Sequence, residues 1–219
     1  MREHEFHPVQ PPLSAAILAG GHGERLGGAD KALIAIDGES LLERQTHILR
    51  QLSDDIMIAG HCGGPLPPSL RRVPDMLPVA GPLAGIHSAL VHARHEWVLV
   101  VPCDAPFLNP DLLRMLRDAA TDDCDAAVPR QDDGFWHPLT AVYSRACIPA
   151  IEALAAQGMR QVIRLFDHVR TRAVAIDALR GADPQLASFV NINTPDDMAA
   201  LREGRASAPI TLGTKPKRW

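Results

Sequence analysis

Short runs rich in Val, Ile and Ala alternate along this chain with longer segments whose apolar residues recur every three or four positions. This alternation is typical of β–α units, in which helices pack around a largely parallel sheet. It predicts an α/β fold with a mostly parallel sheet. The predicted strands are Ala15–Leu18, Asp55–Ala59, Trp97–Val101, Asp125–Val128, Leu139–Tyr143 and Arg172–Ile176.

Helical segments lie between these strands. They are Leu41–Leu52, Pro82–Arg94, Pro110–Ala120 and Ile148–Gln157, followed by a last helix from Thr194 to Arg202. Asn109 is a favourable N-cap and Pro110 suits a first turn, so the third helix has a defined start. In the first helix, the residues at three- and four-residue steps are Leu41, Leu42, Gln45, Ile48, Leu49 and Leu52.

The chain has 219 residues, of which 46% are hydrophobic, and this is enough for one large domain and tight for two. We expect one folded unit, 13–202, because the glycine- and proline-rich stretch 63–68 interrupts the β–α rhythm without changing it. Residues 1–12 and 203–219 lack apolar periodicity and are expected to be flexible tails.

No apolar run approaches the ~20 residues that cross a bilayer, and charges and prolines stand where a signal peptide has its apolar segment. The expected location is therefore the cytoplasm. The cysteines lie far apart and form no Cys-x-x-Cys pair, so buried free thiols are the simplest interpretation. They are Cys62, Cys103, Cys124 and Cys147.

Charge and aromatic content exclude one class of partner. The net charge is −4, and the chain has only three Trp, one Tyr and five Phe. Nucleic-acid binding needs a cationic surface, and capture of single strands needs aromatic platforms as well. We therefore expect neither nucleic acid nor membrane as a partner, and any anionic ligand must be small and held locally.

A glycine-rich loop follows the first strand directly. Its glycines are Gly20, Gly21, Gly23, Gly27 and Gly28. Glycines let backbone N–H groups approach phosphate oxygens, Arg25 and Lys31 supply positive charge, and in an open α/β sheet ligands bind at this end of a strand. The loop matches neither the dinucleotide fingerprint nor the P-loop, so a simple dehydrogenase and a P-loop ATPase are excluded. A loop without a ligand is the structural alternative.

Two acidic residues lie next to other predicted apolar or small-residue segments. Asp104 stands at the end of an apolar strand, between Pro102 and Pro106, where a carboxylate suits Mg²⁺. Asp75 precedes a run of small residues that would let the backbone lie against a ligand. The alternatives are a turn residue at position 104 and an ordinary surface acid at position 75.

These features together favour nucleotidyl transfer. An attacking phosphate is already anionic and needs no general base, so the protein must align it and neutralise the departing pyrophosphate. The candidate catalytic residues are Arg25, Lys31 and Asp104, with Asp104 as the Mg²⁺ ligand. No nucleophilic triad has comparable support.

Seven segments, in order, resemble the molybdenum cofactor guanylyltransferases, which join GMP from GTP to molybdopterin. The segments are Leu18–Gly21 with Arg25, Gly27–Gly28, Asp30–Lys31, Gly81–Gly85, Pro102–Pro106, His137–Pro138 and Phe189–Pro195. The resemblance covers nearly all of the predicted folded unit. It implies a Rossmann-like three-layer nucleotidyltransferase fold, that of the nucleotide-diphospho-sugar transferases.

The resemblance also implies roles for individual residues. Those on the nucleotide side would be Leu18, Ala19, Gly20, Gly21, Lys31, Asp75 and Asp104. Asp104 would hold Mg²⁺, and Asn191 and Asn193 would line the pterin side. The implied partners are GTP and molybdopterin, with other cofactor-biosynthesis proteins or recipient molybdoenzymes as further candidates. One departure is the sequence Ala59-Gly60-His61, where the family often offers an asparagine to the nucleotide.

Two other functions remain open from the sequence. A cytidylyltransferase acting on the same pterin is the nearest alternative, and Gly20 favours guanine because a residue without Cβ leaves room for a purine. A GTP-binding carrier of the cofactor without turnover is the other. His137 has two interpretations, as a packed side chain or as a residue close to the ligand.

Overall fold

The computed structural model describes residues 12–19, 34–36, 38–79 and 81–192, together with Thr194 and Asp197. Their strands are β1 Leu13–Ala19, β2 Ala35–Ile36, β3 Glu39–Ser40, β4 Asp55–Gly60, β5 Leu70–Val73, β6 Trp97–Pro102, β7 Ala126–Arg130, β8 Ala141–Ser144 and β9 Thr171–Ala175. Their helices are α1 Leu41–Leu49, α2 Pro82–His92, α3 Pro110–Ala119 and α4 Ile148–Ala156. Short 3₁₀ turns are η3 Arg145–Cys147, η4 Val162–Asp167, η5 Ile176–Gly181 and η6 Ala187–Phe189.

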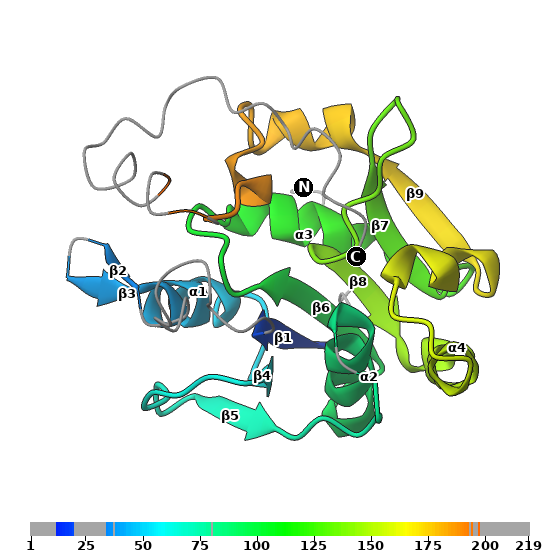
Figure 1. Cartoon of the computed structure of the whole chain (residues 1–219). Coiled ribbons are helices and arrows are strands. Elements are labelled where there is room, and N and C mark those ends of the chain that lie inside the picture. The colour runs from blue at the N-terminus through cyan, green and yellow to red at the C-terminus, as the bar shows by residue number, and fades with distance from the viewer. Residues whose placement is uncertain are drawn as a thin grey trace, which may run out of the picture.

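Seven strands form one sheet in the order β5-β4-β1-β6-β8-β7-β9, and β2 pairs with β3 apart from it (Figure 1). Neighbouring strands are parallel except where β8 runs against β6 and β7. This confirms the α/β fold and the mostly parallel sheet. All six predicted strands are present, and the sequence pattern missed the edge strand β5.

Alternate residues of β1 point to opposite faces of the sheet, as the strand period of two requires. Ala15 and Ile17 pack in the cluster that includes α1 and α3, whereas Ala16 and Leu18 pack in the cluster that includes α2 and α4. Figure 1 shows α3 on one side of the sheet and α2 and α4 on the other. The sheet is therefore the middle of three layers.

The helix starts follow the sequence signals. Ser40 and Glu43 form a reciprocal capping box at α1, and Asn109 accepts hydrogen bonds from the first amides of α3. Thr194 and Asp197 exchange the same reciprocal bonds, at 2.8 and 3.1 Å, where the last helix is predicted to start. The rest of that helix and both predicted tails, except Pro12, lie outside the described residues.

Two helices end before their predicted limits. α1 stops at Leu49 because the chain then turns, with the amide of Ser53 donating to the Leu49 carbonyl at 2.9 Å. α2 stops at His92 because Ala93 is extended and the next amide, that of Arg94, donates to the Asp55 carboxylate at 2.9 Å. A local turn thus ends α1, whereas a tertiary contact ends α2.

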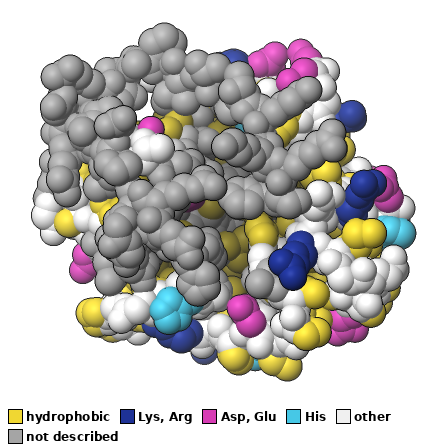
Figure 2. Space-filling view, in the orientation of Figure 1, with side chains coloured by type: hydrophobic (Ala, Val, Ile, Leu, Met, Phe, Trp, Pro, Cys, Tyr) yellow, Lys and Arg dark blue, Asp and Glu magenta, His cyan; other side chains and the backbone are white. Residues whose placement is uncertain are grey.

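The helix lengths, the surface charges and the cysteines can be compared with what the composition predicts. None of the described helices is long and apolar enough to cross a membrane. Basic and acidic side chains are interspersed over the coloured part of the face in Figure 2. The four cysteines are free and buried, and burial raises the pKa of the Cys147 thiol to about 12.

Candidate active site

The carboxyl end of β1 lies between the carboxyl ends of β4 and β6. Leu18 pairs with Ala59 on one side and with Pro102 on the other, and Ala19 pairs with Gly60. The side chains of Leu18 and Ala19 are buried. These two residues can therefore reach a ligand at this edge only through their backbone groups.

Gly60 allows β4 to approach β1 closely at this edge. Its φ is +97°, and a Cβ atom at this position would lie 1.8 Å from the carbonyl oxygen of Ala19. A side chain here would collide with the end of β1. The glycine in the segment Ala59-Gly60-His61 therefore has a structural reason.

Asp104 lies on a tight turn that begins at the end of β6. The amide of Ala105 donates to the carbonyl of Pro102 at 3.3 Å, and the amide of Cys103 donates to the carbonyl of Leu18 at 3.1 Å. The side chain of Asp104 is neither fully buried nor fully exposed. The turn thus holds the backbone of Asp104 beside the end of β1.

The segment around Asn191 reaches the same turn from far along the chain. The amide of Ile192 donates to the carbonyl of Asp104 at 2.9 Å, and the Ile192 side chain packs against Leu41 and Ile36. Asn191 itself is exposed. The structure therefore brings Leu18, Asp104 and Asn191 to one edge of the sheet.

Gln45 of α1 makes a contact with the site that the sequence pattern did not predict. It is buried, and its Nε2 donates to the carbonyls of Pro102 and Ala105 at 2.9 and 2.8 Å. The sequence signal was its place as the polar residue among the leucines and isoleucine on the apolar face of α1.

Asp75 follows β5 and is exposed. The next residue, Met76, donates its amide to the hydroxyl of Ser88 on α2 at 3.3 Å, which ties the Asp75 segment to that helix. The N-cap of α2 is Gly81, with φ +121° and no side chain that could occupy the helix start. Asp75 therefore lies on the β4 side of β1, away from the Asp104 turn.

Five predicted site residues lie outside the described part of the chain. They are Gly20, Gly21, Arg25, Lys31 and Asn193. The described residues on either side of the glycine-rich loop are Ala19, at the end of β1, and Ile34, which packs with Phe107 and Ile192. Both described flanks of the loop thus lie at the edge that carries Asp104.

His137 is packed between aromatic rings. Its ring centroid lies 5.0 Å from that of Phe135 and 4.6 Å from that of Phe189, and the side-chain amide of Gln131 donates to its Nε2 at 2.8 Å. Burial lowers the pKa of His137 to about 4, against a smaller opposing effect of Asp133. The ring is therefore neutral near pH 7, which favours the packing interpretation.

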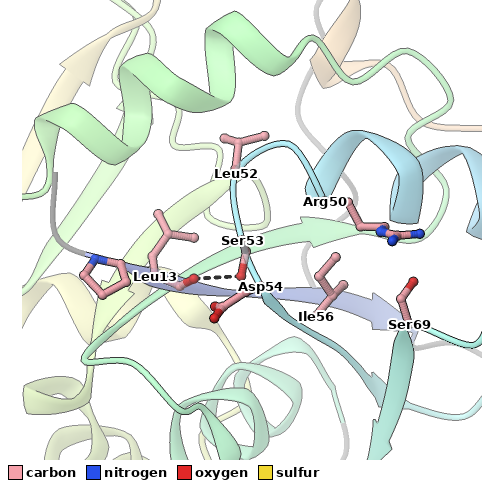
Figure 3. Close-up of a pocket in the computed structure, with 8 residues that line it drawn as sticks. Leu13, Arg50, Leu52, Ser53, Asp54, Ile56 and Ser69 are labelled. Atoms are coloured by element: carbon pink, nitrogen blue, oxygen red, sulfur yellow. Dashed lines mark hydrogen bonds between the residues drawn. The ribbon is translucent and has the colours of Figure 1, made fainter. Parts of the chain in front are cut away.

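An open pocket of about 560 Å³ lies at the opposite edge of the sheet (Figure 3). Leu13 and Ile56, at the amino ends of β1 and β4, line it together with Arg50, Ser53 and Asp54. In parallel α/β sheets ligands bind at the carboxyl ends of strands. This pocket therefore lies on the edge away from Asp104 and is separate from the candidate site.

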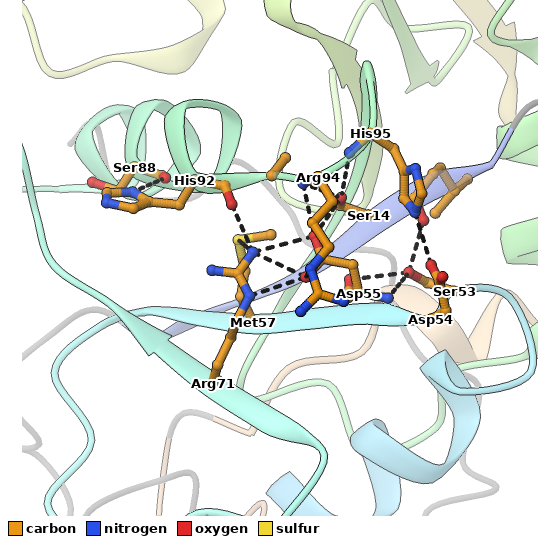
Figure 4. A network of polar contacts seen from close by, with 12 residues as sticks. Ser14, Ser53, Asp54, Asp55, Met57, Arg71, Ser88, His92, Arg94 and His95 are labelled. Carbon is orange, nitrogen blue, oxygen red and sulfur yellow. Dashed lines mark hydrogen bonds and ion pairs between the residues drawn. The ribbon is translucent and has the colours of Figure 1, made fainter.

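A buried ion pair stabilises the same amino edge (Figure 4). Asp55 accepts hydrogen bonds from the Ser14 hydroxyl at 2.6 Å, the Arg94 amide at 2.9 Å and Arg71 Nε at 3.0 Å. Burial by itself would raise the pKa of Asp55, but these three donors outweigh it and hold that pKa below its usual range. The network joins β1, β4, β5 and the end of α2, and its role is structural.

Solved structures identify the class of protein that has this fold. Molybdopterin-guanine dinucleotide biosynthesis protein A from Archaeoglobus fulgidus is similar with a TM-score of 0.75 and 26% identity, over 90% of this chain and 100% of that one. The 2-C-methyl-D-erythritol 4-phosphate cytidylyltransferase from Thermus thermophilus shares the fold, with a TM-score of 0.63 and 19% identity. The similarity covers 90% of this chain and 100% of that one. The fold is that of the α/β nucleotidyltransferases, with the candidate site at the carboxyl edge of the sheet.

Sequence comparisons narrow this class. Residues 15–174 match the family described as the MobA-like NTP transferase domain. The molybdenum cofactor guanylyltransferase of Desulfosudis oleivorans is 34% identical over 202 residues, 89% of this chain and 98% of that protein. The molybdenum cofactor guanylyltransferase of Pseudomonas syringae pv. tomato is 36% identical over 198 residues, which cover 88% of this chain and 94% of that protein. The chain belongs to this family, the MobA-like molybdenum cofactor guanylyltransferases.

Proposed function

We propose that this chain transfers GMP from GTP to molybdopterin, releases pyrophosphate and forms the molybdopterin guanine dinucleotide cofactor. The observation that carries the proposal is the turn of Asp104, which hydrogen-bonds to Leu18 on one side and to Ile192 on the other. Three separate segments of the family resemblance meet there. The names of the relatives supply the nucleotide and the acceptor.

The proposed reaction is a displacement at phosphorus. An oxygen of the molybdopterin phosphate attacks the α-phosphorus of GTP, and the bond from that phosphorus to the bridging oxygen of the β-phosphate breaks. Pyrophosphate leaves with the electron pair. Because the attacking phosphate is already anionic, the protein needs to align the two phosphates and to neutralise charge.

We assign the charge-neutralising role to Arg25 and Lys31. The backbone groups of Leu18, Ala19, Gly20 and Gly21 would bind the nucleotide, because the side chains of Leu18 and Ala19 are buried and glycines have none. Asp75 would contact the nucleotide from the β4 side. Asn191 and Asn193 would contact the pterin, and the bond from Ile192 to Asp104 supports this by placing Asn191 next to the turn.

Mg²⁺ fits the donor chemistry of this site. No group of three or more His, Cys, Asp or Glu side chains that could hold a metal occurs among the residues the structure describes. A single carboxylate suits Mg²⁺, which keeps several waters and binds through one or two carboxylates plus substrate phosphates. Asp104 would hold the ion, which when bound neutralises charge on the triphosphate.

Asp75 is separated from this metal ligand by the strand order. β5 and β6 have β4 and β1 between them, so three spacings of about 4.8 Å place the two strands about 14 Å apart. This distance supports separate roles, with Asp104 as the metal ligand and Asp75 as a nucleotide contact.

We also propose a cytoplasmic location, where GTP is available. The four buried free thiols support a reducing compartment. Other cofactor-biosynthesis proteins or recipient molybdoenzymes would take the product as partners.

A substrate comparison tests the proposal. The purified chain is incubated with Mg²⁺, molybdopterin and GTP, CTP or ATP, and pyrophosphate release is measured together with the dinucleotide product. We expect release with GTP that requires both molybdopterin and Mg²⁺. Preference for CTP would replace the proposal with a cytidylyltransferase. Tight GTP binding without pyrophosphate release would identify a carrier.

Two variants test the site residues. Lys31→Ala removes a charged hydrogen bond to phosphate, so GTP binding measured by calorimetry should weaken about ten- to a hundredfold. Asp104→Asn should lower the rate of pyrophosphate release while the Tm stays close to that of the wild type. Unchanged GTP affinity in the first variant, or a full rate at ordinary Mg²⁺ in the second, would contradict the assignment.

A further inference from the structure

The amide of Gln45 has one possible orientation. Its two partners, the carbonyl oxygens of Pro102 and Ala105, only accept hydrogen bonds, so the NH₂ group must face them. The Gln45 side chain is 1% exposed, and the distances of 2.9 and 2.8 Å are those of well-formed bonds. A helix residue thus joins the two ends of the turn that carries Asp104.

The other bonds of this turn show what Gln45 adds. Leu18 holds the amide of Cys103, and Ile192 holds the carbonyl of Asp104. Without Gln45, the carbonyl of Ala105 would lose its side-chain donor, and the carbonyl of Pro102 would keep the 3.3 Å bond from the amide of Ala105. The turn would then be held on the side of β1 and Ile192 but not on the side of α1.

Gln45 contributes less to stability than its two bonds alone would suggest. It stands on the apolar face of α1, and among the described residues its buried Oε1 has no hydrogen-bond partner. That atom costs free energy, which offsets part of the gain from the two bonds to the turn. Its clear contribution is to the geometry of the turn.

We propose that Gln45 is a positioning residue, which fixes the backbone from which the Asp104 carboxylate extends toward the metal of the bound nucleotide. This inference rests on the proposed function, since it requires Asp104 to be a metal ligand. Residues that orient a ligand in this way typically change metal affinity or activity about 10- to 100-fold when they are replaced.

The test compares Gln45→Met with Thr46→Val. Methionine keeps the length of the side chain and removes the donor. Thr46 is the next residue on α1, also buried, and its hydroxyl donates within the helix to the Leu42 carbonyl at 2.6 Å without contacting the turn. The valine variant therefore controls for the loss of a buried polar group on the same helix.

Binding of Mn²⁺ to the protein with GTP, followed by the electron paramagnetic resonance signal of free Mn²⁺, is the main readout. We expect Gln45→Met to weaken Mn²⁺ binding at least about tenfold and Thr46→Val less than about twofold. The apparent KM for Mg²⁺ in pyrophosphate release should rise, with kcat largely recovered at high Mg²⁺. Equal Mn²⁺ affinity in Gln45→Met and Thr46→Val would overturn the positioning role.

Gln45→Glu keeps the inference testable if the methionine variant does not fold. An ionised glutamate cannot donate to the two carbonyls, whereas a protonated one can donate to one of them. Mn²⁺ binding by this variant at pH 8 should therefore be at least about tenfold weaker than that of Thr46→Val. Mn²⁺ affinity equal to that of Thr46→Val would overturn the proposal.

The two proposals fail in different ways. If the wild type releases no pyrophosphate with GTP and molybdopterin, the proposed function is wrong. If it does, and Gln45→Met behaves as Thr46→Val, only the positioning role is wrong. Mn²⁺ binding that survives in Asp104→Asn would also overturn the positioning role, because Asp104 would then not be the ligand.

Discussion

At position 60 the backbone of β4 lies against the last residue of β1, and two penalties would meet any side chain there. One is the positive φ of +97°, and the other is the carbonyl oxygen of Ala19, which would lie 1.8 Å from a Cβ atom. Gly158 has a positive φ of +73° as well, but nothing lies within 4 Å of a Cβ atom there. A comparison of Gly60 with Gly158 therefore separates the free-energy cost of backbone strain from the cost of a collision.

We expect Gly158→Ala to lower the free energy of unfolding by about 1–2 kcal/mol, the cost of a left-handed alanine. Gly60→Ala should cost about 3 kcal/mol or more, because the end of β1 must also move. Urea unfolding of both variants measures this difference. Equal losses of unfolding free energy in the two variants would mean that the collision with Ala19 adds no cost at position 60.

His137 predicts a dependence of stability on pH. Its folded pKa of about 4 lies below the ordinary value of 6.5, so the unfolded chain binds a proton first as the pH falls. The neutral packed ring therefore contributes stability above pH 6.5 that is lost progressively between pH 6.5 and 4. At pH 5 this loss is about 2 kcal/mol relative to pH 8.

Urea unfolding of the wild type and His137→Gln at pH 8 and pH 5 tests this. The difference between the two proteins in free energy of unfolding should shrink by about 2 kcal/mol at pH 5. His168→Gln, at an exposed position, serves as the control for replacing a histidine by glutamine. A constant difference between His137→Gln and the wild type would contradict the lowered pKa.

At the scale of elements, Asn109 both caps α3 and ties it to the C-terminal part of the described chain. Its Oδ1 accepts from the amides of Asp111 and Leu112 at 2.8 and 3.2 Å, and its Nδ2 donates to the Ala182 carbonyl at 3.0 Å. Asn109→Ala should lower the free energy of unfolding by about 1–2 kcal/mol. Asn109→Asp, which keeps the cap, should lose less in the same thermal or urea unfolding series. An equal loss in Asn109→Ala and Asn109→Asp would show that the stabilisation comes from the bond to Ala182 and not from the helix cap.

Local signals predicted most elements because each had a cause within a few residues. The apolar strands β1, β4 and β6 are buried on both faces, and α3 has Asn109 and Pro110 at its start. β5 was missed because Leu70 and Val73 enclose two arginines, a short pattern that becomes a strand only by pairing with β4. The reversed direction of β8 goes with the connection from β7 to β8, which contains no helix.

Those parts of the candidate site that depend on a single strand and the residue after it could be predicted from the sequence. Leu18 and Ala19 end one apolar strand and Asp104 follows another, so their place at the carboxyl edge follows from the strand direction. The bond from Ile192 to Asp104 joins residues 88 positions apart, and the bonds from Gln45 join α1 to a turn 57 residues further on. Only the three-dimensional structure could show these contacts.

At the scale of the whole molecule, the two edges of the sheet have different tasks. The amino edge holds the buried Asp55 network, and the carboxyl edge holds Asp104 with its turn. Asp55→Ala leaves Arg71 without its carboxylate and should cost about 3 kcal/mol of stability. GTP affinity of the folded variant, measured by calorimetry well below its Tm, should stay within about twofold of the wild type.

Asp104→Asn is the complementary case, with activity lost and stability kept. A large loss of GTP affinity in folded Asp55→Ala would contradict the separation of the two edges. Comparison of the two variants in both assays therefore tests the division of the sheet directly.

The single reversed strand has a consequence for how such a chain can diversify. Because β8 runs against β6 and β7, the connection from β7 to β8 is a hairpin at the carboxyl edge and needs no helix to cross the sheet. Its tip, Asp132 and Asp133 followed by Gly134 at φ +88°, is turned away from the core. Residues can be added or removed there without threading a new segment through the packed layers. The hairpin between β7 and β8 can thus change in length while the half of the sheet formed by β5, β4, β1 and β6 stays the same.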